Sequence, residues 1–193
     1  MKIQILLSIV AMSFVTAFAA DPVQAISKND KELQTLLKKK SLNKKDNERV
    51  KALLSDVFNF KRLAEKTLPK ETWASLDDAS KDSFATEFQR MVRNSSAKRL
   101  EMYRTDSTIY DAPKLKKNNT EANVTAHLWY KGKESVLVYK MTLENGNWMA
   151  WDLVIDALST ARNYKEQFAT ILKTKSFGEL LETIKKKADE IEE

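Results

Sequence analysis

The sequence predicts an α+β domain, in which an antiparallel sheet of about four strands packs against a layer of helices. Apolar residues recur at helical spacing from Pro22 to about residue 102. They alternate with polar residues between about residues 107 and 155, and helical spacing returns after Leu158. Helices that flank one uninterrupted group of strands are typical of α+β folds rather than alternating α/β folds.

The first twenty residues differ from the rest of the chain. Lys2 is their only charged residue, an apolar run follows it, and Ala17-Phe18-Ala19 precedes Asp21-Pro22. A basic start, an apolar centre and a small-residue exit predict a cleaved signal peptide over 1–20, although the run is close to the lower limit for a membrane anchor. We therefore expect a soluble exported protein whose residues 21–193 form a single domain.

The amino-terminal helices follow from two apolar stripes and one break. Residues 46–59 carry the first stripe, and Leu68-Pro69 interrupts the helical pattern. Asp77 or Asp78 can then cap a long helix that carries the second stripe. The first stripe consists of Val50, Leu53, Leu54, Val57 and Phe58, and the second of Phe84, Phe88, Met91 and Val92.

The strands are predicted from alternation. Two runs alternate clearly, a third over Trp148 to Ile155 is apolar nearly throughout, and a weaker one covers about 107–111. Short connections at 131–133 and 145–147, each containing glycine, indicate hairpins. The apolar positions of the two alternating runs are Val124, Ala126, Leu128 and Tyr130, followed by Leu137, Tyr139, Met141 and Leu143. Helical spacing resumes from Leu158 and again from Leu180.

Composition excludes several kinds of protein. The chain has no cysteine, so neither thiol chemistry nor a disulfide scaffold is possible. Its formal net charge is +6, but the lysines are dispersed and are not interleaved with aromatic residues, which argues against a nucleic-acid partner. Attraction to anionic headgroups or an acidic partner stays open. Residues 38–45 and 114–117 are the candidate docking segments.

Catalytic motifs are absent from the sequence. With a single histidine, His127, the chain cannot form a His/Cys metal site, and it contains no P-loop, G-x-S-x-G or H-E-x-x-H sequence. Asp152 stands out because it interrupts the most apolar strand, where a carboxylate needs hydrogen bonds. We interpret both residues as structural. Asn123 begins an N-x-T sequence after an acidic residue, which is a weak signal for glycosylation.

Three segments, in order, resemble the MlaC family of periplasmic phospholipid-binding proteins, also called toluene-tolerance proteins. The segment from Trp148 to Phe168 reads WMAWDLVIDALSTARNYKEQF and is similar to the family's signature. The others are Phe60-Lys-Arg-Leu-Ala with the following Leu68, Trp73, Phe84 and Phe88, and the ending from Phe168 to Leu181. Two residues depart from the pattern: Pro69 and Ala157 stand where the family has glycine.

The resemblance implies a helical layer against a four-stranded sheet that encloses a cavity for acyl chains. It further implies a monomeric periplasmic carrier without catalysis, metal or cofactor, whose cargo is phospholipid. Its partners would be an outer-membrane lipoprotein complex and an inner-membrane ABC transporter with an MCE-domain subunit, and the carriage would maintain the lipid asymmetry of the outer membrane.

We expect the cavity to be lined by the sheet face that carries the apolar strand positions, with the long helix as its roof. Two acyl chains contribute a gross transfer free energy of roughly 24 kcal/mol at about 0.8 kcal/mol per methylene. Ordering of the chains offsets much of it, but release into water is still slow, so delivery requires a docked partner. The predicted lining is Val124, Ala126, Leu128, Tyr130, Leu137, Tyr139, Met141, Met149, Trp151, Leu153 and Ile155, roofed by Phe84, Phe88 and Met91.

Two other classes of function remain open at this point. A periplasmic enzyme would need Asp152 and His127 to meet, and strand alternation places them poorly. A chaperone-like protein would need an exposed apolar surface instead of an enclosed one. Lipid that co-purifies with the protein would separate a carrier from both.

Overall fold

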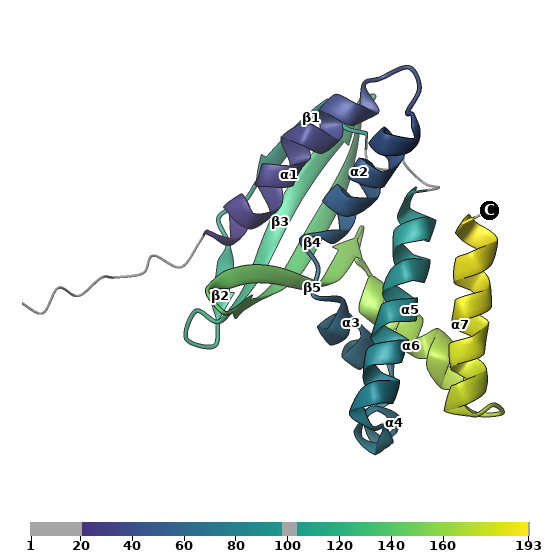
Figure 1. The fold of residues 1–193 in the computed structure, drawn as a ribbon. Coiled ribbons are helices and arrows are strands. Elements are labelled where there is room, and N and C mark those ends of the chain that lie inside the picture. Colours follow the sequence, from purple (N-terminus) through teal and green to yellow (C-terminus); the bar gives the residue numbers. More distant parts are fainter. Residues whose placement is uncertain (1–20, 98–103, 193) are drawn as a thin grey trace, which may run out of the picture.

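The computed structural model describes residues 21–97 and 104–192, and Figure 1 shows their arrangement. Helix α1 lies along one face of a curved antiparallel sheet, with α2 beside it, and five further helices gather at one end of that sheet. The helices are α1 (Pro22–Leu37), α2 (Lys44–Ser55), α3 (Phe60–Thr67), α4 (Lys70–Ser75), α5 (Asp78–Ala97), α6 (Thr160–Ile171) and α7 (Phe177–Glu192). The predicted signal peptide lies outside the described residues.

Side-chain caps begin the first helices. The Asn43 side chain accepts a hydrogen bond from the backbone of Asp46, whose carboxylate accepts one in return, and this capping box starts α2. Leu33, Leu36 and Leu37 of α1 then pack on Val50 and Leu53 of α2. Val50, Leu53 and Leu54 of the predicted stripe therefore form the contact between α1 and α2, whereas Val57 and Phe58 follow the end of α2 at Ser55.

The predicted break before α5 is confirmed. Thr67 ends α3, and Pro69 precedes α4 with a φ of −54°, which the proline ring favours. The departure from the family's glycine is thus unstrained at this position. Asp77 Oδ1 accepts the backbone N–H of Ser80 at 2.7 Å, so Asp77 caps α5.

The sheet has six strands within the described ranges, two more than predicted. Their spatial order is β1-β3-β4-β5-β6, and β2 also pairs with β3. The bounds are β1 (Ser107–Tyr110), β2 (Lys114–Lys116), β3 (Glu121–Tyr130), β4 (Lys133–Glu144), β5 (Asn147–Ile155) and β6 (Leu158–Ser159). The additional strands, β2 and β6, have three and two residues, too few for alternation to reveal.

Both predicted hairpin turns are present. Lys131 and Gly132 have φ values of 50° and 75°, and Asn145 and Gly146 have 50° and 80°. Two successive residues with positive φ are characteristic of the tight turns that suit twisted hairpins. At the β5–β6 turn, Ala157 has a φ of 69°, a conformation that costs a residue with a Cβ roughly 1–2 kcal/mol. This explains why glycine is the family residue there.

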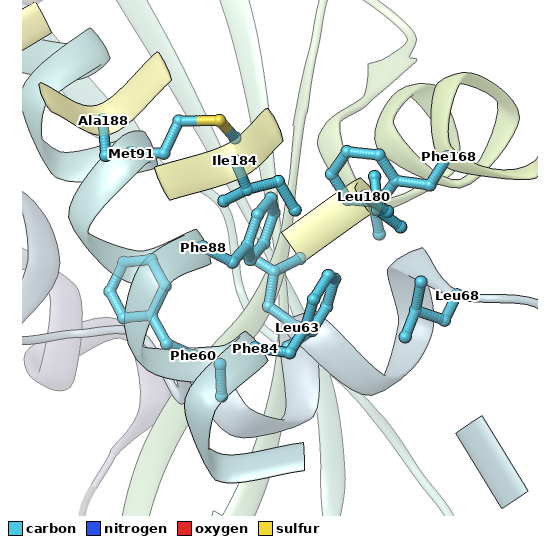
Figure 2. Close-up of a cluster of buried hydrophobic side chains, with 13 residues drawn as sticks. Phe60, Leu63, Leu68, Phe84, Phe88, Met91, Phe168, Leu180, Ile184 and Ala188 are labelled. Atoms are coloured by element: carbon cyan, nitrogen blue, oxygen red, sulfur yellow. The ribbon is translucent and has the colours of Figure 1, made fainter. Parts of the chain in front are cut away.

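A separate apolar core, here called the helical core, lies away from the sheet among the helices at its end. Phe84 and Phe88 of α5 stack at a centroid distance of 5.9 Å, and Phe168 of α6 meets both edge to face. Leu180 and Ile184 of α7 close the cluster, which Figure 2 shows in close-up. The α+β class is confirmed, and the helices divide into a pair at the sheet and a bundle with its own core.

Candidate functional site

A groove runs along α5, between this helix and the stretch of chain that comprises α2, the α2–α3 connection and the start of α3. It consists of two hollows of about 540 and 320 Å³ that share Thr86 and Gln89. The larger hollow is lined in addition by Phe58, Asn59, Phe60, Lys61, Asp82 and Ala85, and the smaller by Glu48, Lys51, Arg90, Arg93 and Asn94. One end of the groove is thus partly apolar, and the other carries mostly basic and amide side chains.

The wall opposite α5 is held by the sheet. The backbone N–H of Asn59 donates to the carbonyl of Ala150 at 2.8 Å, and the N–H of Ala150 donates to Val57 at 2.7 Å. The Asn59 side chain also caps α3 through Arg62 N and donates to Glu144 of β4. These bonds fix the α2–α3 connection against the middle of β5.

Phe58 stands between the groove and the interior of the protein. It lines the larger hollow, and it packs against both the sheet cluster and the helical core. Its side chain is only half-buried. Phe58 therefore contacts both the groove and the apolar face of the sheet.

That face contains most of the predicted lining. Val124 pairs with Tyr139, Ala126 with Leu137, and both partner residues continue to Leu153 and Ile155 on β5. Directly opposed residues of an antiparallel pair share a face, and every second residue follows them. The predicted positions that lie on this face are Val124, Ala126, Leu128, Tyr130, Leu137, Tyr139, Met141, Leu153 and Ile155.

Two predicted positions are misplaced. The register shifts between Lys140 and Met141, so Thr142 pairs with Met149 and Met141 pairs with Ala150. Met149 therefore lies on the opposite face. Trp151 is left without a partner at the irregularity, and its ring lies 5.4 Å from Lys140 Nζ. A bulge adds one residue to one strand and reverses the alternation beyond it.

The predicted roof is also wrong. Phe84, Phe88 and Met91 pack in the helical core against α3, α6 and α7, as Figure 2 shows. Ile26 of α1, with Val23 and Ala25, covers the sheet face instead. A stripe on one helix predicts a buried face, but it does not specify which element covers that face.

A half-buried polar pair lies beneath α1 at the same sheet face. The Tyr110 hydroxyl donates to Asp30 Oδ2, and Tyr110 is paired with Ala126. Burial raises the pKa of Asp30, and the hydrogen bond from Tyr110 opposes part of that rise. Burial and the charge of Asp30 raise the pKa of Tyr110 above its usual range. Neither residue was predicted at the site.

Asp30→Asn is expected to change how stability depends on pH. Because the folded-state pKa of Asp30 lies above its unfolded value, the folded protein binds more protons, and its unfolding free energy falls as pH rises from about 4 through the folded pKa. The variant should lose this decline and be more stable than the wild type at pH 7. Urea unfolding at pH 4 and pH 7 measures the slope. The exposed Asp56→Asn is the matched control, and parallel slopes for wild type and Asp30→Asn would contradict the prediction.

The two residues of the enzyme alternative do not meet. Asp152 is fully buried and accepts hydrogen bonds from Lys140 Nζ at 2.8 Å, Ser159 Oγ at 2.7 Å and the Ala161 N–H at 2.9 Å. His127 lies on the same sheet face, contrary to the expected alternation. Asp152 lies level with Asn123 of β3, because both pair with Lys140. His127 is four residues further along β3, which corresponds to about 13 Å at 3.3 Å per residue.

His127 is engaged by other carboxylates. Its Nδ1 lies 2.7 Å from Glu134 Oε1, and its Nε2 lies 3.4 Å from Asp111 Oδ2. The hydrogen bond to Glu134, supported by Asp111, raises the pKa of His127. Asp152 and His127 are thus each held by their own structural partners.

The weaker sequence signals fall on the sheet and on the surface. Asn123 is half-buried within β3, between Lys114 and Lys140. The candidate docking strand Lys114–Lys116 is exposed throughout. Its neighbour Lys117 pairs with Glu121 at 2.8 Å, and in the other basic segment Lys39 pairs with Asp46 at 2.6 Å.

A comparison with protein families identifies the chain. The model of the MlaC protein family matches residues 27–186. The chain belongs to the MlaC family. A search of curated proteins finds no match. The resemblance that the three ordered segments suggested is thus confirmed.

A solved structure has the same fold as this MlaC chain. It is the phospholipid-binding protein from Ralstonia solanacearum in complex with a phospholipid, with 20% sequence identity and a TM-score of 0.74. The match covers 90% of this chain and 100% of that chain. Among residues 21–97 and 104–192, no helix is long and apolar enough to cross a membrane, and no group of side chains could hold a metal ion.

Proposed function

We propose that this MlaC-family protein binds phospholipid and carries it as cargo without chemical change. The observation that carries the proposal is the family match over residues 27–186, supported by a shared fold with a protein solved in complex with a phospholipid. Such a carrier needs apolar surface for acyl chains and a polar opening for the headgroup. The groove and the adjacent sheet face are suited to both.

The sheet face supports the acyl chains in this proposal. Leu128, Tyr139, Leu153 and Ile155 are only half-buried there, so apolar area remains that a ligand can cover. Phe58 separates this face from the groove. Entry of a lipid would therefore require displacement of Phe58, and the chains would then contact the nine predicted residues that share the face.

The finer proposal concerns place and partners. The predicted signal peptide over 1–20 delivers the mature domain, residues 21–193, to the periplasm as a monomer. There it shuttles phospholipid between an outer-membrane lipoprotein complex and an inner-membrane ABC transporter with an MCE-domain subunit. The large transfer free energy of two acyl chains favours hand-over within a docked complex rather than release into water.

An enzymatic role receives less support. The carboxylate of Asp152 already accepts three hydrogen bonds from the protein and is fully buried. A general acid or base must reach the substrate, and this carboxylate is enclosed by the protein and held by its three donors. We therefore propose neither a catalytic residue nor a cofactor.

Mass spectrometry of organic extracts tests the proposal directly. The protein is expressed with its amino-terminal segment in a Gram-negative host and purified without detergent. We expect phospholipid close to one molecule per protein. Protein that is empty and also takes no phospholipid from vesicles would contradict the proposal.

A pair of variants tests the site. Leu153→Lys places a charge on the sheet face and should reduce bound phospholipid severalfold. Leu158→Lys, whose parent side chain is 72% exposed, is the matched control and should leave lipid unchanged. Circular dichroism establishes that both variants fold. Equal lipid in both would place the acyl chains elsewhere.

A further inference from the structure

Arg93 of α5 has no hydrogen-bond acceptor among the residues that the structure describes. Its side chain is half-buried, and its Nε is buried and has no hydrogen-bond partner. Within the described part of the chain, neither a hydrogen bond nor an ion pair engages the guanidinium. A buried polar group left unpaired destabilises a folded protein by about 1–3 kcal/mol, and by more when the group is charged. A ligand that supplies an acceptor would remove this cost.

The neighbouring cations of the smaller hollow are already paired. Lys51 Nζ lies 3.0 Å from Glu48, and Arg90 binds both Glu87 and Asp189. The other arginine with a buried unpaired Nε is Arg62, but its guanidinium faces Glu121 at 3.4 Å and Glu144 at 3.7 Å. Arg93 differs from all three because, among the described residues, it forms no ion pair; Glu48, which lines the same hollow, pairs with Lys51.

The position of Arg93 suits an amphipathic anion. It lines the hollow of about 320 Å³, which continues through Thr86 and Gln89 into the hollow bounded by Phe58 and Ala85. Eight residues of α5 separate Ala85 from Arg93, which corresponds to about 12 Å along the helix. A ligand that fills both hollows would place an anionic group at Arg93 and its apolar part towards Phe58.

We propose that Arg93 binds the phosphodiester of the bound phospholipid, with the headgroup in the smaller hollow between α2 and α5. The inference rests on the proposed function and specifies which end of the groove receives the headgroup. A guanidinium presents paired N–H donors that match two phosphate oxygens, and such charge-assisted bonds are strong in a partly buried site. Lys51, which shares the hollow, adds positive charge.

The decisive variant is Arg93→Gln, because binding and stability should change in opposite directions. Loss of the charge-assisted bonds should weaken the binding of phosphatidylglycerol and phosphatidylethanolamine about tenfold to a hundredfold. Lipid-free Arg93→Gln should be at least as stable as lipid-free wild type, because the buried Nε–H that lacks an acceptor is gone. Arg162→Gln, in an exposed position on α6, is the control with the same change in charge.

A lipid without phosphate separates this proposal from the proposed function. Diacylglycerol with the same acyl chains is offered in the same vesicles, and its binding should be equal for wild type and Arg93→Gln. If the variant loses both lipids equally, or keeps full affinity for phospholipid, the role of Arg93 is refuted while the carrier function stands. If wild type takes up neither lipid, the carrier function itself fails.

Two more measurements sharpen the result. Arg93→Lys keeps the charge but loses the paired donors, so its phospholipid affinity should lie between those of wild type and Arg93→Gln. Inorganic phosphate at millimolar concentration should neither stabilise the lipid-free protein nor displace bound phospholipid. If it did both, through Arg93, the site would be one for free phosphate, and the assignment to the lipid headgroup would be overturned.

Discussion

Phe84→Ala is expected to reduce the unfolding free energy by about 3–5 kcal/mol, because the ring is fully buried and its truncation leaves a cavity that the bundle cannot refill. Phe84 stacks on Phe88 and meets Phe168 and Phe177 at centroid distances of 5.8–5.9 Å. These aromatic contacts join α5 to α6 and α7, so their loss should loosen the whole bundle.

Urea unfolding of the lipid-free protein measures this effect. Leu158→Ala is the control, since that side chain is 72% exposed and its truncation should change stability by less than about 0.5 kcal/mol. The result also separates two roles for Phe84. If Phe84→Ala retained stability but lost bound phospholipid, the ring would line the acyl cavity as its helical stripe first suggested, and its place in the bundle core would be contradicted.

Local patterns were sufficient to predict the fold class, the two tight turns and the helix that carries Phe84. These features depend on residues close in sequence: alternation in β3 and β4, glycines in the turns, and a stripe with its Asp77 cap. The partner of each buried face depends on residues distant in sequence. For this reason the stripe predicted a buried face correctly, but its assignment to the sheet was wrong.

The candidate site was predicted less completely than the fold. Nine of the eleven sheet positions share the predicted face, and the bulge between Lys140 and Met141 accounts for Met149 and Trp151. In β5 the residues that face each side of the sheet are nearly all apolar, so the sequence does not indicate where a bulge occurs. Ile26, Asp30 and Leu33 do follow helical spacing, so the covering face of α1 could have been found from the sequence.

Arg93 had no signal in the sequence. It is one of many basic residues, and what distinguishes it is a buried Nε that has no acceptor among the described residues. Which basic residues have ion-pair partners depends on the packing of α2 and α5. Glu48 pairs with Lys51, and Glu87 pairs with Arg90. Phe58 was predicted as part of a stripe, but its position between two apolar clusters required the three-dimensional structure.

Asp152→Ala is expected to destabilise the protein by about 3–5 kcal/mol, because the Ala161 N–H and the Ser159 hydroxyl lose their acceptor, at about 1–3 kcal/mol each, and Lys140 loses its partner. The carboxylate is fully buried and connects three elements: Lys140 of β4, Ser159 of β6 and the Ala161 N–H in the first turn of α6. Ser159 in turn caps α6 by accepting the N–H of Arg162 at 3.1 Å. One substitution therefore removes both the ion pair and the support of a helix start.

Thermal and urea unfolding measure the loss, with Asp156→Ala as the control. Asp156 is exposed, accepts the backbone N–H of Val136 and has a φ of 46°, so alanine there should cost about 1–2 kcal/mol, which is less than the loss at Asp152. Hydrogen exchange at the Ala161 amide should accelerate in Asp152→Ala and not in Asp156→Ala. A variant as stable as the wild type, with Ala161 still protected, would show that the buried carboxylate does not hold α6 to the sheet and would reopen a functional role for Asp152.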